Sequence, residues 1–160
     1  MKIKKMGYLA SISLAALVLS SQVFAAGKAP MDAKVVKKAM VSSKASIAAG
    51  KKSFKTYCAS CHGESGDANT PVAKVLNPPP RNLADASVKW TAGKEPADVY
   101  NTVANGLPGT SMVGFKASLN EVQRWEVVHF IGSLAGSKGK FKAVTKKNVD
   151  KIYKQTQPKK

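Results

Sequence analysis

The sequence contains few cysteines, histidines and acidic residues. Its 160 residues include only two cysteines and two histidines, so a framework of several disulfide bridges is excluded. A zinc site built from Cys and His would need all four of these side chains. Nine acidic residues oppose 26 lysines and arginines, which gives a formal net charge of +17 at pH 7. This excess of positive charge favours acidic partners or surfaces.

Long apolar runs are also scarce, and the clearest one lies near the N-terminus. The uncharged stretch 8–19 follows lysines at positions 2, 4 and 5, and it is shorter than the roughly 20 residues of a membrane-spanning helix. Val23-Phe24-Ala25 then supplies the residues expected before a signal-peptidase cleavage site. We therefore expect a signal peptide at 1–25, cleavage after Ala25 and a periplasmic protein. An uncleaved membrane anchor is the alternative.

No segment shows the alternation of apolar and polar residues that is typical of a half-buried strand. Ile47, Gly50, Phe54 and Tyr57 instead recur at helical spacing, which predicts a helix that runs into Cys58. A glycine inside a helix costs about 1 kcal/mol relative to alanine. We therefore expect another helix to cross closely at Gly50.

Two further helices are predicted downstream. One begins with Pro96 in its first turn and stops at Gly106. The other follows Ser118 and Glu121, which have the spacing of a capping box, and its apolar face continues to near Gly136. The later helix is the natural candidate to cross the earlier one.

Loops and basic flanking segments make up the rest of the chain. The Asn-Pro-Pro-Pro run at 77–80 fits neither a helix nor a central strand. The predicted fold is all-α, with three to four helices and long loops. We divide the mature chain into a basic leader at 26–45, a domain at 46–136 and a lysine-rich tail at 137–160.

Each flanking segment has two interpretations. Apolar residues in the leader would form one weakly apolar helical face, and those in the tail a short amphipathic helix that packs back on the domain. These residues are Val35, Val36, Ala39 and Met40 in the leader and Val144, Val149, Ile152 and Tyr153 in the tail. The alternative is that both segments are solvated arms.

Both cysteines lie in the stretch Cys58-Ala59-Ser60-Cys61-His62. A Cys-x-x-Cys-His motif is typical of covalent c-type haem attachment. The two thiols bond to the porphyrin, and the adjacent histidine supplies an axial nitrogen to the iron. We therefore predict one haem c, anchored by Cys58 and Cys61 and ligated by His62.

Two other chemistries use the same residue types. A thioredoxin-like dithiol would follow a buried strand, whereas the residues before Cys58 are helix-like and rich in Ala and Lys. A zinc site would have to recruit His129, which is far along the chain from Cys58, Cys61 and His62. Neither alternative matches the pattern as well as haem does.

The surrounding residues resemble class I c-type cytochromes over roughly residues 46–136. In that family a glycine and an aromatic residue precede the haem motif and meet an apolar and an aromatic residue of the terminal helix. Glycines, a proline and a proline-rich turn follow the motif, and a methionine lies in a Gly/Pro-rich loop. The matching residues are Gly50, Phe54, Val127, Phe130, Gly63, Gly66, Pro71, Pro78-Pro79-Pro80-Arg81 and Met112. The resemblance implies the cytochrome c fold, wrapped around a covalently bound haem.

Met112 is the expected sixth ligand of the iron. It follows a Pro-Gly turn that would hold its thioether on a short rigid loop, whereas Met31 and Met40 lie in the leader. His129 falls inside a predicted helix, and we expect it to have a packing role. Ligation by methionine and histidine raises the reduction potential relative to two histidines and closes the iron to small ligands.

Three further residues are candidates for contacts around the haem. A ligating histidine usually donates its second N–H to a carbonyl. By resemblance, the carbonyl of Pro71 is the expected acceptor for His62, with the 78–80 turn as second choice. Arg81, by family position, and Trp90, through its indole N–H, are candidates to bind the haem propionates. Trp90 is equally well explained as a core residue.

These features predict an electron carrier rather than an enzyme. Its expected partners are acidic redox proteins such as an oxidase, a reductase or a dehydrogenase, and an anionic membrane surface is a further candidate. Nucleic acid is not expected, because no binding motif for it is present. The alternatives are a dedicated cytochrome subunit of a larger respiratory complex and a haem enzyme or sensor with a displaceable methionine.

Overall fold

Seven helices joined by loops form the part of the chain that the computed structural model describes, residues 31–85, 87–134 and 144–158. They are α1 (Ala33–Ala39), α2 (Lys44–Tyr57), α3 (Ala59–His62), α4 (Pro71–Val75), α5 (Pro96–Asn105), α6 (Glu121–Ser133) and α7 (Val149–Gln155). Within these residues no strand forms, and the isolated bridge pairs Gly106 with Val113. The predicted all-α class is confirmed. None of the described helices has the length and hydropathy to cross a membrane, and the expected signal peptide lies outside the described residues.

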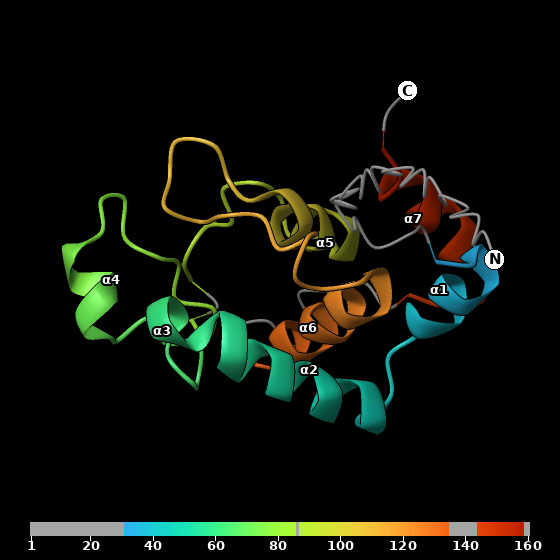
Figure 1. Cartoon of the computed structure of the whole chain (residues 1–160), viewed down its shortest axis with the longest axis horizontal. Coiled ribbons are helices and arrows are strands. Elements are labelled where there is room, and N and C mark those ends of the chain that lie inside the picture. Colours follow the sequence, from blue (N-terminus) through green and yellow to red (C-terminus); the bar gives the residue numbers. More distant parts are fainter. Residues whose placement is uncertain (1–30, 86, 135–143, 159–160) are drawn as a thin grey trace, which may run out of the picture.

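Helix α6 lies at the centre of the arrangement (Figure 1). Helix α2 packs along one side of it and α5 along the other, while α1 and α7 meet at one end of the molecule. Helices α3 and α4 lie at the opposite end. Side chains buried completely at these contacts include Trp125, Phe54, Met40, Leu119 and Val127.

The predicted close crossing at Gly50 joins α2 to α6. A Cβ atom on Gly50 would overlap the backbone carbonyl of Glu126 in α6. Four residues later, the rings of Phe54 and Phe130 are 5.0 Å apart between centroids. The glycine therefore lets two backbones approach, and the aromatic pair fills the space beside them.

Helix α2 starts earlier than its apolar pattern begins. The side chain of Ser43 accepts a hydrogen bond from the backbone N–H of Ser46 at 3.0 Å, and the hydroxyl of Ser46 accepts one from the N–H of Ser43 at 2.9 Å. This reciprocal cap fixes the first residue as Lys44. The helix then runs into Cys58, as predicted.

The predicted capping box of α6 is wrong by two residues. Asn120 is the N-cap: its side-chain oxygen accepts from the backbone N–H of Gln123, and its own backbone N–H donates to the side-chain oxygen of Gln123. The N–H of Ser118 instead donates to the carbonyl of Phe115 in a turn, at 3.1 Å. Leu119 is completely buried, so the chain has to turn inward before the helix can begin. The predicted end near Gly136 lies outside the described residues, and α6 ends at Ser133.

Two other helices test the remaining patterns. Helix α5 begins with Pro96 at its first position and ends before Gly106, as predicted. Helix α4 was not predicted, although Thr70 caps it by accepting a hydrogen bond from the N–H of Ala73 at 2.9 Å. The Thr70-Pro71 pair is a typical helix start that was readable in the sequence.

The leader and the tail both form helices that pack on the domain, α1 on α6 and α7 on α5 and α1. Val36 and Met40 of the leader are completely buried, and apolar residues of the tail pack against the same core. An ion pair of 2.7 Å between Lys37 Nζ and Asp150 Oδ1 joins α1 to α7. The same ammonium lies 5.2 Å from the centroid of the Tyr153 ring. The helical interpretation of both flanking segments is therefore correct for the described residues.

His129 connects the leader to the core. Its Nδ1 lies 2.9 Å from the hydroxyl of Ser46, and its Nε2 lies 3.1 Å from the carbonyl of Met40. Burial lowers the pKa of His129, and the bond to the Met40 carbonyl opposes this shift. Both ring nitrogens are engaged, which agrees with the predicted packing role.

We expect Gly50→Ala to destabilise the protein. The added methyl group would force α2 and α6 apart, at a cost of about 1–3 kcal/mol that exceeds the gain in helix propensity. Urea unfolding followed by circular dichroism measures the change. Lys51→Ala, at the next and exposed position, should shift the free energy of unfolding by less than about 0.5 kcal/mol. Equal stability of Gly50→Ala and wild type would contradict the close crossing.

We expect Met40→Ala to lower the free energy of unfolding by about 2–5 kcal/mol, because it leaves a cavity between the leader and α6. The same unfolding measurement applies. Val41→Ala changes a side chain that is 39% exposed and serves as the matched control. A leader that did not belong to the core would make the two variants equally stable.

Candidate functional site

The haem-attachment motif lies where α2 ends and α3 begins. Cys58 closes α2 and starts α3, and the N–H of His62 donates to the carbonyl of Cys58 at 2.9 Å. Residues three and four apart share one face of a helical turn, so Cys61 and His62 lie on the same side as Cys58. Neither thiol forms a disulfide. One helical turn thus presents both cysteines and the histidine together.

The ring of His62 is held by the carbonyl of Arg81. Nδ1 of His62 lies 3.0 Å from this oxygen. The predicted acceptor, Pro71, is wrong because Pro71 begins α4 and its carbonyl points into that helix. Arg81 directly follows the proline turn at 78–80, which was the second choice.

This hydrogen bond determines which nitrogen of His62 can bind a metal ion. A carbonyl only accepts, so Nδ1 carries the proton and the lone pair lies on Nε2. Burial lowers the pKa of His62, and the bond to the Arg81 carbonyl partly opposes the shift. The imidazole is therefore neutral, with Nε2 as the atom that can bind a metal.

Arg81 and Trp90 lie together, as both propionate candidates should. The guanidinium of Arg81 lies 4.3 Å from the centroid of the Trp90 ring. Its Nη1 donates to the carbonyl of Lys89 at 2.6 Å, and its Nη2 donates to that of Asp85 at 3.5 Å. The Nε atom of Arg81 is buried and has no hydrogen-bond partner within the described residues. A buried donor without a partner is rare and suits an anionic group bound beside it.

Met112 sits on a loop whose backbone is closed by hydrogen bonds. The N–H of Leu107 donates to the carbonyl of Met112 at 2.9 Å, and the N–H of Met112 donates to Oγ1 of Thr110 at 3.0 Å. Gly106 opens the loop with a φ of 80°, where a Cβ would lie 2.5 Å from the Met112 carbonyl. Only glycine fits this position without strain.

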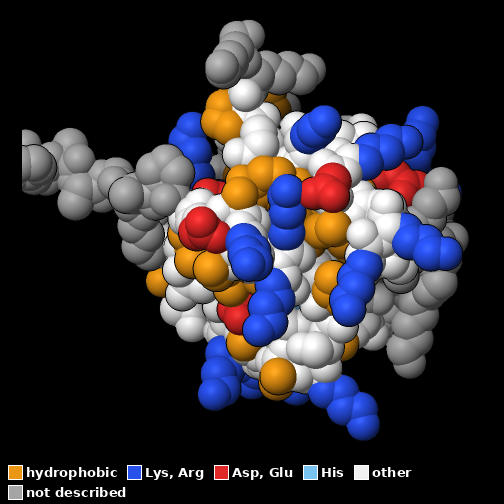
Figure 2. Space-filling view, turned by 90° about the vertical axis from the view of Figure 1, so that its right-hand side faces the viewer, with side chains coloured by type: hydrophobic (Ala, Val, Ile, Leu, Met, Phe, Trp, Pro, Cys, Tyr) orange, Lys and Arg blue, Asp and Glu red, His pale blue; other side chains and the backbone are white. Residues whose placement is uncertain are grey.

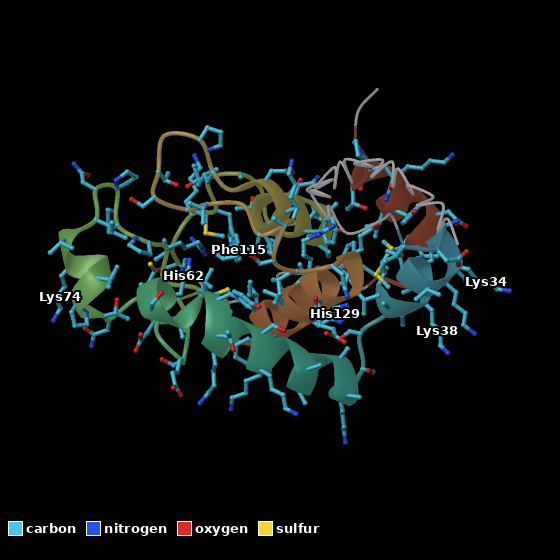
Figure 3. All side chains as sticks on the ribbon, viewed as in Figure 1. Lys34, Lys38, His62, Lys74, Phe115 and His129 are labelled. Carbon is cyan, nitrogen blue, oxygen red and sulfur yellow. The ribbon has the colours of Figure 1, made fainter. Side chains whose placement is uncertain are left out.

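An aromatic contact joins the methionine loop to the haem-attachment motif. The rings of Tyr57, just before Cys58, and Phe115, three residues after Met112, meet edge to face with centroids 6.1 Å apart. Figure 3 shows Phe115 on the loop side and His62 on the α3 side of the same region. The structure thus brings the two predicted ligand segments together from opposite parts of the chain.

The geometry argues against the two competing chemistries. His129 is engaged elsewhere, and no group of three or more potential metal-ligating Cys, His, Asp or Glu side chains exists among the described residues. Cys58 is only 7% exposed, and burial, reinforced by Cys61, raises its pKa to about 12. A redox-active dithiol needs the opposite, an accessible thiol with a lowered pKa.

Comparison with known proteins agrees with the site. The family model described as cytochrome C oxidase, cbb3-type, subunit III matches residues 45–131, more than half of the chain. The chain belongs to this family of c-type cytochrome domains. The match confirms the c-type cytochrome domain that the sequence motifs predicted. Haem-based electron transfer is the activity of this class.

A solved structure is similar as well. A chain of a reducing HAO-like protein complex from Kuenenia stuttgartiensis is 31% identical, with a TM-score of 0.50. The match covers 57% of this chain and 44% of that one, so this chain corresponds to less than half of that relative. No curated protein sequence matches the chain.

The family implies haem c, and the residues of the site fit that group. Two unbridged cysteines and a histidine with Nε2 directed away from its carbonyl partner share one turn. Met112 offers a thioether from an anchored loop, and the buried Nε of Arg81 lacks a partner that a propionate would provide. Packing alone does not explain why these groups occur together, whereas a bound haem c would contact each of them.

We expect Arg81→Gln to lower the reduction potential by tens of millivolts, because removing a positive charge near the haem favours the ferric form. A redox titration followed by visible absorbance measures the shift. Arg81→Lys keeps the charge and should recover most of the potential. Lys89→Gln removes a charge from an exposed neighbouring residue and is the control. Equal reduction potentials for Arg81→Gln and Lys89→Gln would contradict a contact between Arg81 and a haem propionate.

Proposed function

We propose that the protein is an electron carrier with one haem c, attached through thioether bonds to Cys58 and Cys61 and ligated by His62 and Met112. When bound, haem c supplies an iron centre that exchanges one electron without making or breaking bonds. The observation that carries the proposal is the His62 ring, held by the Arg81 carbonyl so that Nε2 is available for iron.

Each residue of the site has a distinct task. The Arg81 carbonyl fixes the plane of the His62 ring and keeps its proton on Nδ1. The loop hydrogen bonds of Met112 limit its motion, so this residue would supply its thioether to a bound haem iron. An iron that always keeps Met112 as its sixth ligand would not bind small ligands, which favours a carrier over an enzyme or sensor.

We further propose that the carrier works in the periplasm. The signal peptide expected at 1–25 supports this location, as does haem attachment through two thiols. The formal net charge, +17 for the full sequence and +14 once residues 1–25 with their three lysines are removed, favours encounters with acidic redox partners, such as an oxidase, a reductase or a dehydrogenase.

A dedicated subunit of a larger respiratory complex is the second candidate. The description of the matching family as an oxidase subunit favours it, and so does the origin of the similar solved chain in a protein complex. Co-purification with such a complex at high salt would support the subunit over a free shuttle.

Met112→Ala tests the ligand assignment. Wild-type ferric protein should show the weak absorbance near ~700 nm that is expected of a methionine ligand, and the variant should lose it. The reduced variant should also bind carbon monoxide, because its sixth position is open. Visible spectra with and without carbon monoxide measure both effects.

The control is Met31→Ala, which removes a half-buried methionine of the leader and should keep the ~700 nm band. Survival of the band in Met112→Ala would refute the assignment. Rapid uptake of carbon monoxide by the reduced wild type would instead support a haem enzyme or sensor.

A further inference from the structure

The positive charge of this protein lies mainly outside the haem-binding domain. Residues 46–136 contain nine Lys and Arg against seven Asp and Glu, a net charge of only +2. The flanking segments 26–45 and 137–160 contain 14 lysines and only two acidic residues, Asp32 and Asp150, and the other three lysines lie in the expected signal peptide. If acidic partners docked at the haem itself, we would expect the excess positive charge on the domain and not on the flanking segments.

Helices α1 and α7 bring the described part of this charge to one end of the molecule. We call this the basic end and define it by its exposed lysines, which are Lys34, Lys38, Lys146, Lys147, Lys151 and Lys154. Figure 2 looks onto this end and shows Lys and Arg side chains spread across it, with hydrophobic side chains between them. The ion pair of Lys37 with Asp150 holds the two helices together.

The two acidic residues of the flanks, Asp32 and Asp150, are outnumbered by these six lysines. The carboxylate of Asp32 caps α1 by accepting hydrogen bonds from the N–H groups of Lys34 and Val35, at 2.8 and 3.2 Å. The carboxylate of Asp150 is paired with Lys37. The exposed ammonium groups therefore face solvent in excess, and a negatively charged surface is their complement.

Exposed apolar side chains accompany the lysines on the leader. Val35 is 49% exposed and Val41 is 39% exposed, close to Lys34 and Lys38 in the sequence. Val36 and Met40 meanwhile face the core. Lysines interspersed with exposed apolar residues are typical of a segment that lies at a lipid interface.

The basic end lies far from the proposed haem site. In Figure 3, Lys34 and Lys38 are at one end of the molecule, whereas His62 and Lys74 lie toward the other. A redox protein bound at the basic end would not approach the haem. A surface that only holds the carrier in place has no such requirement.

We propose that the basic end binds the anionic surface of a phospholipid membrane and leaves the end that carries His62 free to meet redox partners. This inference adds a site of action to the proposed carrier function without depending on it. Its test uses binding alone, so either proposal can fail without the other.

The test is sedimentation of the full-length mature holoprotein with vesicles of phosphatidylcholine, with and without phosphatidylglycerol. Wild type should bind only the anionic vesicles and should dissociate at high salt. The triple variant Lys34→Gln, Lys38→Gln, Lys151→Gln should bind on the order of 100-fold more weakly, because each lysine near such a surface contributes roughly fivefold.

A matched control removes three charges elsewhere. This second triple variant carries Lys51→Gln, Lys52→Gln and Lys74→Gln, which alter exposed lysines of α2 and α4. If the basic end is the contact, its affinity for anionic vesicles should fall by less than about 10-fold. Val35→Ser with Val41→Ser should weaken binding several-fold with no change in charge. Unchanged visible spectra and reduction potentials would show that all variants keep their haem site.

Three outcomes would overturn the inference. Equal losses in the two triple variants would show that net charge alone attracts the protein. Equal binding to neutral and anionic vesicles would exclude recognition of the anionic headgroups. Absence of binding to anionic vesicles, with salt-sensitive retention on immobilised polyglutamate, would assign the basic end to an acidic protein.

Discussion

The close crossing of α2 and α6 at Gly50 is the contact on which the site depends. Because Gly50 has no side chain, the backbone of α6 can lie against α2, and this fixes the direction in which α2 reaches Cys58. On its other side α6 carries Trp125, which stacks on Tyr100 of α5 at 4.8 Å between centroids. Helix α5 then ends in the loop that holds Met112. One helix therefore positions both ligand segments.

The sequence predicted the elements of the site better than the contacts between them. The Cys-x-x-Cys-His motif, the methionine loop and Gly50 are local patterns whose residue types are demanded by backbone geometry or by iron. The acceptor for His62 could not be read in this way, because every residue, proline included, offers the same backbone carbonyl. Only the path of the chain after Pro80 decides that Arg81, rather than Pro71, lies within reach.

Helix boundaries and the flanking segments also depend on contacts that local sequence patterns do not reveal. Ser118 has the right spacing for a cap, yet the burial of Leu119 moves the helix start to Glu121. In the leader, the weak apolar pattern alone could not show that Val36 and Met40 are completely buried. That burial depends on the surface of α6, which is formed by residues about 90 positions later, and the Met40 carbonyl accordingly meets His129 across a separation of 89 residues. Long-range partners of this kind leave no local signal.

The pairing of α1 with α7 also bears on the order of events in maturation. Lys37 and Asp150 belong to the first and last described helices, so this contact can form only after nearly the whole chain is available. Contacts between residues so distant in sequence are slow to form. In the finished fold the Cys58 thiol is buried and protonated, a poor nucleophile that few reagents would reach. A haem that bonds to Cys58 would therefore have to reach this thiol before the core around it closes. The pairing of α1 with α7 is a separate, late step at the end of the molecule remote from His62 (Figure 3).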